Sequence, residues 1–269
     1  MRTSRIACLA VASCLTMQGC GGTAFTLPPV SNQEALLAAA NIDADPTLPQ
    51  FPRSRAYYRE AISRIEQKLS ERVASICVRA ETQDCRFNFQ YVDDDEVNAF
   101  TDEAGNIYLH RGMLDYLETD EEIAAVMAHE MSHQIAGHVD ETQNSILLGA
   151  LLGGLLMGGV AAAGGASQAG VEDMTAVGME NGGRIGMITF SKEQEREADY
   201  LSAYVLARAG YDLRRAGRLF EVLAKLDDGA IASWKDTHPA GAERIVAWRK
   251  AVAEVEASPE QLPTKAALD

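Results

Sequence analysis

Basic residues are scarce in this sequence. Its 269 residues include 24 lysines and arginines against 39 aspartates and glutamates, which leaves a formal net charge of −15. Such a chain repels anionic surfaces, so nucleic acid is a poor candidate partner. The apolar fraction of 47% and the charged fraction of 23% are ordinary for a globular protein. The length allows one sizeable domain or two small ones.

Cysteine is also scarce, with five in the whole chain. Cys77 and Cys85 have no neighbour at metal-ligand spacing, which argues against a cysteine metal site. In a compartment that permits disulfides, we expect these two residues to form a bridge that closes a small loop. Two free thiols are the alternative. The sequence contains no internal repeat.

The first twenty residues are typical of an export signal rather than of folded structure. Two arginines precede a mostly apolar run, Ile6–Met17, which is too short to span a membrane. The small residues around Cys20 resemble a bacterial lipobox, in which the cysteine is acylated. We therefore expect a signal peptide at residues 1–19 and a lipid on Cys20. The alternatives are a plain secretory signal and an earlier lipobox that ends at Cys14.

The spacing of apolar and turn-forming residues predicts an α+β fold, mostly helical, with a small β-sheet beside the central helix. Residues 20–50 are expected to form a lipidated tether, residues 51–256 the folded domain and residues 257–269 a flexible tail. The predicted helices cover 32–40, 55–76, 112–117, 120–138, 193–209, 212–226 and 240–256, and the predicted strands cover 87–92, 97–100 and 107–110.

One segment carries no charge at all, from Thr142 to Val171. Within it, residues 146–165 are apolar, and seven of them are glycine. The length suits a transmembrane helix, but this many glycines weaken a helix. We expect residues 142–190 to form a glycine-rich insert, as a helical hairpin or a lid, that contacts the membrane or apolar substrate. A true membrane span is the alternative.

His129 and His133 stand four residues apart in the predicted helix 120–138. Four residues advance roughly 400° around a helix, so both rings project from one face, about one turn apart. Two imidazoles at that spacing can hold one zinc ion. Glu130 can take a proton from a zinc-activated water as the water attacks a peptide carbonyl. The pattern arises by chance in about one such chain per hundred.

The third ligand must come from elsewhere in the chain. His138 follows His129 by nine residues, which places it on the opposite face of a continuous helix. We interpret His138 as a surface or packing residue. The metzincin pattern, with a further glycine and histidine at fixed positions, is also absent.

Glu195 and Asp199 are the best candidates to complete the site, because they are four residues apart and share a helix face. Glu195 can ligate zinc, while Asp199 can accept a hydrogen bond from the other ring nitrogen of a liganding histidine. Glu193 and Glu197 are expected to point elsewhere. A solvated acidic face is the alternative interpretation of this segment.

Several ordered motifs carry a family resemblance over residues 95–250. Beside the histidine motif, they are Asn98-Ala99-Phe100, Ile107-Tyr108-Leu109-His110-Arg111-Gly112, Gly137-His138, the segment from Ser191 to Asp199, Thr237-His238-Pro239 and Glu243-Arg244-Ile245. With them the chain resembles the minigluzincin zinc metallopeptidases, family forty-eight, which include HtpX and the type I CAAX prenyl proteases. It is particularly similar to the small periplasmic lipoprotein members of LoiP type. Related members carry a C-terminal repeat domain for which this sequence leaves no room.

The resemblance implies one zinc ion on His129, His133 and Glu195, with Glu130 as the general base and Asp199 orienting a ligand. It also implies a zinc-dependent endopeptidase that cleaves misfolded or misassembled envelope proteins. The expected partners are those substrates and the membrane, reached through a lipid anchor on the periplasmic face of the outer membrane. The alternative is an envelope chaperone or assembly factor with little proteolytic activity. The oligomeric state is left open.

Two further features have open roles. His238 precedes a proline outside the metal helices, and in the family an equivalent histidine can approach the zinc. It is expected to stabilise the oxyanion, to occupy the open zinc position as a brake, or only to pack at a helix entry. Asn98, Ala99 and Phe100 are expected to bind extended substrate along an edge strand, by backbone pairing; an ordinary core strand is the alternative.

Overall fold

The computed structural model describes residues 23–43, 48–82, 84–163, 167–169, 171–174, 176, 190–227, 238 and 241–267. The expected signal peptide and Cys20 lie outside these residues. The predicted α+β, mostly helical fold is confirmed. The helices are α1 (Asn32–Asp43), α2 (Arg55–Ser70), α3 (Ala74–Ala80), α4 (Arg111–Leu114), α5 (Asp120–Ile135), α6 (His138–Ala163), α8 (Lys192–Arg208), α9 (Leu213–Ala216), α10 (Arg218–Asp227) and α12 (Ala242–Ala257), and the strands are β1 (Asn88–Val92), β2 (Ala99–Thr101) and β3 (Asn106–His110).

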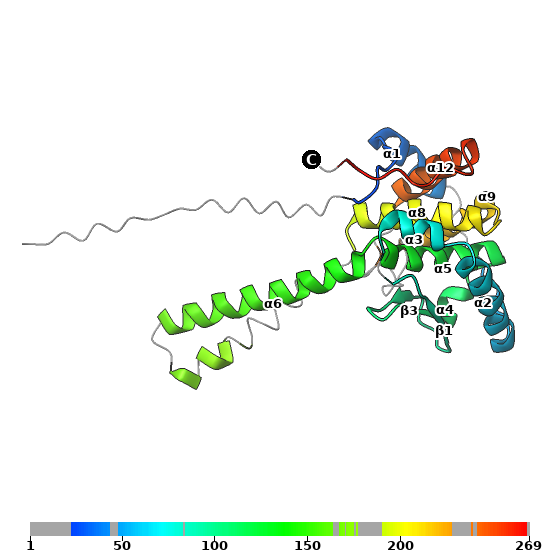
Figure 1. Cartoon of the computed structure of the whole chain (residues 1–269). Helices are drawn as coiled ribbons and strands as arrows, with labels where there is room; N and C mark the ends of the chain where they lie inside the picture. Colours follow the sequence, from blue (N-terminus) through cyan, green and yellow to red (C-terminus); the bar gives the residue numbers. More distant parts are fainter. Residues whose placement is uncertain are drawn as a thin grey trace, which may run out of the picture.

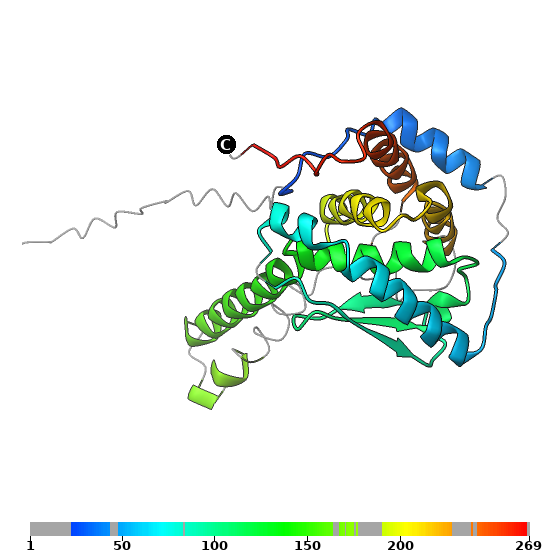
Figure 2. The same ribbon diagram turned by 45° about the vertical axis from the view of Figure 1, so that its right-hand side comes forward.

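Helix α5 lies at the centre of the domain, between the sheet and α8 (Figure 2). Thr119 caps its N-terminus by accepting a hydrogen bond from the backbone N–H of Glu122. Three acidic residues in the first turn suit the positive end of the helix dipole. Neighbours cover α5 on all sides, which explains why it is buried almost all round rather than along one stripe.

Helix α5 ends earlier than the sequence predicts. Gly137 adopts a left-handed conformation, with φ of 80°, and stops the helix just beyond Ile135. Helix α6 then starts afresh at His138 with a new axis. The predicted continuous helix 120–138 is therefore wrong at its end. This break decides where the His138 side chain points.

The described part of the sheet has three strands in the order β1-β3-β2. Strands β1 and β3 are parallel, with Phe89 opposite Ile107, whereas β2 runs antiparallel to β3, with Phe100 opposite Tyr108. Strand β2 thus forms one edge of the sheet, and it packs beside α5. Gly112, just after β3, allows close backbone approach, because a Cβ there would meet the carbonyl oxygen of Asp95 at 2.3 Å.

Helix α8 begins with a capping box in which Ser191 and Gln194 satisfy each other's backbone N–H groups. It packs along α5 on one side and under α12 on the other, while α1 lies against α12 (Figure 2). This layering places the C-terminal half of α5 against the first turns of α8. The two predicted metal-binding segments therefore face each other.

The N-terminal part of the domain differs from expectation in two places. The helix predicted over 55–76 is divided into α2 and α3 by a turn after Ser70. Residues 23–28, expected within the tether, pack on the domain, and the Phe25 ring is fully buried in the core. Phe25 forms a β-bridge with Lys265, so this segment pairs with the chain near the other terminus.

Helix α6 projects away from the body of the domain (Figure 1). It holds much of the glycine-rich insert as one helix of 26 residues. Large apolar side chains are exposed along it, at Leu151, Leu152, Leu155, Leu156 and Val160. No helix of the described residues combines the length and apolarity that a membrane crossing needs.

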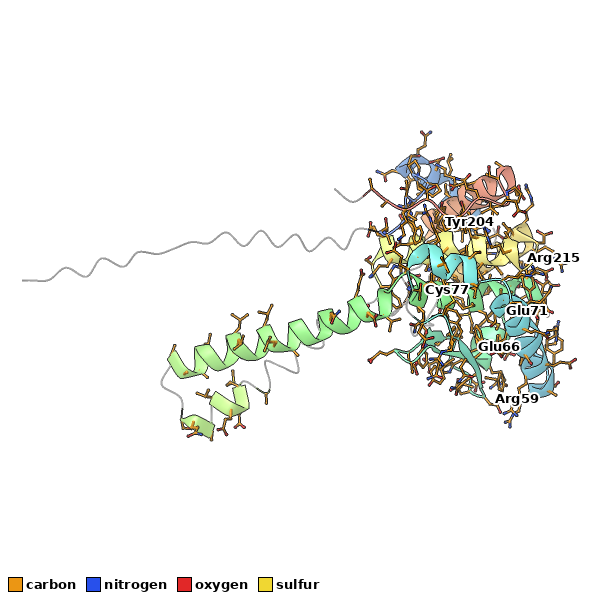
Figure 3. The ribbon with its side chains drawn as sticks, viewed as in Figure 1. Arg59, Glu66, Glu71, Cys77, Tyr204 and Arg215 are labelled. Carbon is orange, nitrogen blue, oxygen red and sulfur yellow. A yellow bond between two sulfur atoms is a disulfide. The ribbon has the colours of Figure 1, made fainter. Side chains whose placement is uncertain are left out.

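The structure joins Cys77, labelled on α3 in Figure 3, to Cys85, with 6.0 Å between their Cα atoms. The bridge ties the end of α3 to the chain that enters β1.

Replacing both cysteines by serine should lower the free energy of unfolding by about 2–3 kcal/mol, because the unfolded chain regains the entropy of a short closed loop. Urea unfolding measures this change. Reduced wild type should match the double variant, and an unchanged midpoint after reduction would contradict a structural bridge.

Candidate metal centre

Three side chains converge between α5 and α8. His129 Nε2 and His133 Nε2 lie 3.0 Å apart, as the spacing on one helix predicts. The two oxygens of Glu195, from α8, lie 3.2 Å from His133 Nε2 and 3.4 Å from His129 Nε2. All three residues are fully buried. The structure therefore brings together the three ligands that the sequence predicts.

The donor set fits a zinc ion. Zinc is commonly bound by two imidazole nitrogens and one carboxylate oxygen, with a fourth position left for water. A tetrahedral ion with bonds of about 2.0–2.1 Å separates its ligand atoms by about 3.3 Å. The observed separations of 3.0, 3.2 and 3.4 Å bracket that value. The expected zinc cofactor is confirmed.

Asp199 contacts the ring nitrogen of His129 that faces away from the other ligands, and Arg244 in turn holds Asp199. His129 Nδ1 lies 2.9 Å from Asp199 Oδ1, so Asp199 has the position expected of it. Arg244 on α12 donates two hydrogen bonds to Asp199, both of 2.8 Å. The third guanidinium nitrogen lies 2.6 Å from Glu195 Oε2. Arg244 thus contacts both a ligand and the residue that orients another ligand.

The same contacts set the charge of the site. Burial alone would raise the pKa of Glu195, but the charge of Arg244, with His238 and His129, holds that pKa well below its usual value. Burial alone would lower the pKa of His129, but Glu195 and Asp199 raise it to about 9. The buried carboxylates thus favour a positive charge between them, either a proton or a metal ion.

Burial lowers the pKa of His133 well below its ordinary value and that of His238 to about 3. Both rings are therefore neutral, which is the form that binds metal. His238 belongs to the same group, since His129, His133, Glu195 and His238 each offer a ligand atom within 4.8 Å of the others.

Glu130 lies beside the ligands on α5 and is fully buried. Neither of its oxygens accepts a hydrogen bond within the part of the chain that the structure describes. The ring nitrogen His238 Nε2 is 3.5 Å from Oε1. Burial raises the pKa of Glu130 to about 8 in the absence of metal. A buried carboxylate in this position is poised to accept a proton.

His138 lies outside the group of ligand atoms, as expected, but it is buried and hydrogen-bonded rather than on the surface. The break at Gly137 turns its ring back toward α5, where Nδ1 lies 3.0 Å from His133 Nδ1. Glu197, expected to point elsewhere, lies 3.0 Å from His138 Nε2. Both side chains are buried. The Gly137-His138 pair was the sequence signal for this arrangement, because glycine often ends a helix.

Phe190 and Arg244 were also given no role from the sequence. The Phe190 ring stacks on His133, with centroids 3.8 Å apart. Arg244 could not be found from spacing, because it lies 45 residues beyond its partner Asp199. Only the packing of α12 on α8 brings the two together.

The predicted substrate residues lie in and just before β2, which packs beside α5. In β2, Ala99 is buried and Phe100 is partly exposed, while Asn98 just before the strand is buried. Strand β2 reaches α5 through Gln134, which donates a hydrogen bond of 2.7 Å to Thr101 Oγ1.

A second group of possible ligands lies near the sheet, made of Asp94, Glu96 and His110. His110 Nδ1 already contacts Asp94 Oδ1 at 2.8 Å, and both carboxylates are exposed. Exposed acidic groups of this kind occur widely as ion pairs, so we assign no metal to them.

The pKa of Glu130 predicts how stability depends on pH in metal-free protein. The folded protein keeps a proton up to about pH 8, whereas the unfolded carboxyl releases it near 4.5. The proton on Glu130 therefore stabilises the folded protein fully below about pH 4.5, and this contribution is lost as the pH rises toward 8. Between pH 5 and 8, the Tm of metal-free wild type should therefore fall more than that of Glu130→Gln. The exposed control Glu103→Gln should follow wild type, and parallel curves for all three proteins would contradict the assignment.

Comparison with known proteins finds relatives that are named as proteases. The chain is 34% identical over 153 residues to the mitochondrial metalloendopeptidase OMA1 of Arabidopsis thaliana, covering 57% of this chain and 29% of that one. It is 33% identical over 164 residues to the beta-barrel assembly-enhancing protease of Escherichia coli, covering 59% and 33%. It is 35% identical over 157 residues to the metalloprotease LoiP of Escherichia coli, covering 58% and 59%. The match thus spans about a third of the first two relatives.

The model of peptidase family M48 matches residues 63–252, which include every element of the centre. This agrees with the predicted minigluzincin resemblance, with its LoiP-like relatives and with the predicted class of enzyme, a metalloendopeptidase. The chain belongs to peptidase family M48.

Proposed function

We propose that this protein is a zinc-dependent endopeptidase that hydrolyses peptide bonds in misfolded or misassembled cell-envelope proteins. The observation that carries the proposal is Glu130. A fully buried carboxylate whose oxygens accept no hydrogen bond within the described residues would be costly in a site that only holds metal. Beside His129, His133 and Glu195, the same carboxylate has a chemical use as a base.

The chain's own residues account for the steps of hydrolysis. His129, His133 and Glu195 would hold a zinc ion, which would supply the Lewis acidity that lowers the pKa of a water toward neutrality. Glu130 accepts the proton of that water and later delivers it to the leaving amine. Asp199 and Arg244 keep His129 and Glu195 in place throughout, so little reorganisation is needed at the moment of reaction.

We assign His238 to the reacting carbonyl, as a donor to the oxyanion. Its neutral ring lies beside Glu130 and near the ligand atoms. A ring N–H in that position can donate to the developing oxyanion. The alternative roles are a reversible occupant of the open zinc position and a packing residue.

Substrate binding is assigned to the edge strand formed with Asn98, Ala99 and Phe100. An extended peptide can pair with a free strand edge through its backbone, which selects unfolded chain rather than a particular sequence. The position of β2 at the sheet edge and beside α5 supports this assignment. The partly exposed Phe100 ring gives an arriving peptide apolar contact.

Residues 142–190 are assigned as a lid or contact arm rather than a membrane span. Support comes from α6, which begins at His138 next to the centre and exposes a row of aliphatic side chains. Such a surface suits contact with exposed apolar substrate or with lipid.

The cellular setting is the bacterial envelope, with a lipid on Cys20 that holds the chain at the periplasmic face of the outer membrane. The basic start, the short apolar run and Cys20 support it. One bacterial relative is named a beta-barrel assembly-enhancing protease, which is consistent with substrates in that compartment.

The competing function is an envelope chaperone or assembly factor that retains zinc but cleaves little. Glu130 distinguishes the two functions, because binding of unfolded chains does not require a base at the metal.

Wild type should cleave casein or a misfolded envelope protein, and Glu130→Gln should lower kcat about 10²- to 10⁴-fold while zinc content stays at one ion per chain. Peptide release and metal analysis measure the two effects. Glu121→Gln, a control in the first turn of the same helix whose side chain pairs with Arg215, should keep wild-type activity. Equal cleavage by wild type and Glu130→Gln would reject the mechanism.

His238→Ala should lower kcat by about ten- to a thousand-fold with little change in KM, because an oxyanion donor acts mainly in the transition state. Steady-state kinetics on a quenched peptide separate the two constants. A rise in kcat would instead assign the brake, and unchanged kinetics would count against both active roles.

A further inference from the structure

A chain of hydrogen bonds begins on the outer side of His133. The Nε2 of this ring faces the other ligands, while its Nδ1 lies 3.0 Å from His138 Nδ1. Contact between two ring nitrogens at this distance needs one N–H donor and one lone pair. A neutral His133 that ligates metal through Nε2 carries its proton on Nδ1. His133 is therefore the donor and His138 the acceptor.

The direction of the next bond follows from the first. Since His138 Nδ1 accepts, the proton of its neutral ring sits on Nε2 and is donated to Glu197 Oε2, 3.0 Å away. The other oxygen of Glu197, Oε1, accepts a hydrogen bond of 2.8 Å from the backbone N–H of Phe25. His138 is 1% exposed and Glu197 is 2% exposed, so water does not substitute for these partners.

The N–H of Phe25 is held in place from both sides. The fully buried ring anchors the residue in the core. The backbone N–H of Thr26 donates to Thr264 at 2.8 Å, and that of Ala266 donates to Ala24 at 2.9 Å. Arg196 donates to the carbonyl of Pro28 at 2.8 Å. These contacts leave the Phe25 N–H pointing at Glu197 rather than at its pairing partner.

The two histidine ligands are thus supported differently. His129 contacts Asp199 directly, and Arg244 fixes Asp199 from within the body of the domain. His133 is supported through two intermediate side chains, and the last hydrogen bond comes from the N-terminal segment 23–28. If residues 23–28 undock from the domain, Glu197 loses the N–H of Phe25 and keeps only His138 of the two donors that the structure gives its carboxylate oxygens.

We propose that His138 and Glu197 are positioning residues for the zinc ligand His133, and that seating of residues 23–28 on the domain completes this relay. Zinc affinity then depends on whether the N-terminal segment is docked. The inference rests on the metal site of the proposed peptidase but not on its substrates. The N-terminal segment is thereby a structural part of the metal centre rather than only a connection to whatever precedes it.

The relay is tested by zinc affinity, measured on the full chain by competition with a chromophoric chelator and without substrate. Loss of a hydrogen-bonding partner behind a zinc ligand typically weakens metal binding about 10- to 100-fold. Glu197→Gln and His138→Phe should both fall in that range. Glu193→Gln, an exposed control on the same helix, should bind as wild type. Circular dichroism and metal-free Tm identify any variant that fails to fold.

The N-terminal contribution is tested with a matched pair at one position. Phe25→Ala loses the buried ring but keeps the N–H, whereas Phe25→Pro loses both. Zinc should bind Phe25→Pro more weakly than Phe25→Ala by about ten-fold. Wild-type affinity in both variants would overturn the role of the segment, whereas equal weakening of both would show that the ring alone seats it.

Wild-type affinity in folded Glu197→Gln and His138→Phe would overturn the relay as a whole. Peptidase activity is a separate readout. An inactive wild type that binds zinc normally would contradict the proposed function and leave the affinity comparison intact.

Discussion

The packing of α5 against the first turns of α8 is the contact on which the rest of the site depends. It places His129 and His133 opposite Glu195 and Asp199, and it buries all four side chains. Buried charges of this density need compensation, and burying them without it costs several kcal/mol per ion. Arg244 provides part of it by bonding to both carboxylates. A divalent cation among the ligand atoms would offset the rest, so this packing favours a bound metal ion.

Much of this arrangement could be predicted from the sequence, because it depends on local periodicity. Residues four apart on a helix share a face whatever surrounds the helix, which is why the pairs His129 with His133 and Glu195 with Asp199 were correctly placed. Most helices and all three strands were found for the same reason, with ends that differ by a few residues. In the structure, the side chains of Thr119 and Ser191 cap α5 and α8, and Gly105 forms the turn before β3.

What could not be predicted depends on a single backbone torsion or on long-range packing. The left-handed conformation of Gly137 changes the direction of the chain and turns His138 from the far face of a predicted helix onto His133. Glu197 was set aside because its partners, His138 and Phe25, lie 59 and 172 residues away. The contacts of Arg244 and the docking of residues 23–28 could not be predicted for the same reason, because they also join segments far apart in the sequence. No periodicity reveals a contact between segments that meet only in the folded domain.

The central claim is that one zinc ion is held by His129, His133 and Glu195. Anomalous diffraction at the zinc absorption edge, from crystals of the zinc-loaded protein, tests it most directly. The account predicts one strong peak within bonding distance of the two Nε2 atoms and a Glu195 oxygen. A peak at the group of Asp94, Glu96 and His110 instead, or no peak between α5 and α8, would contradict it.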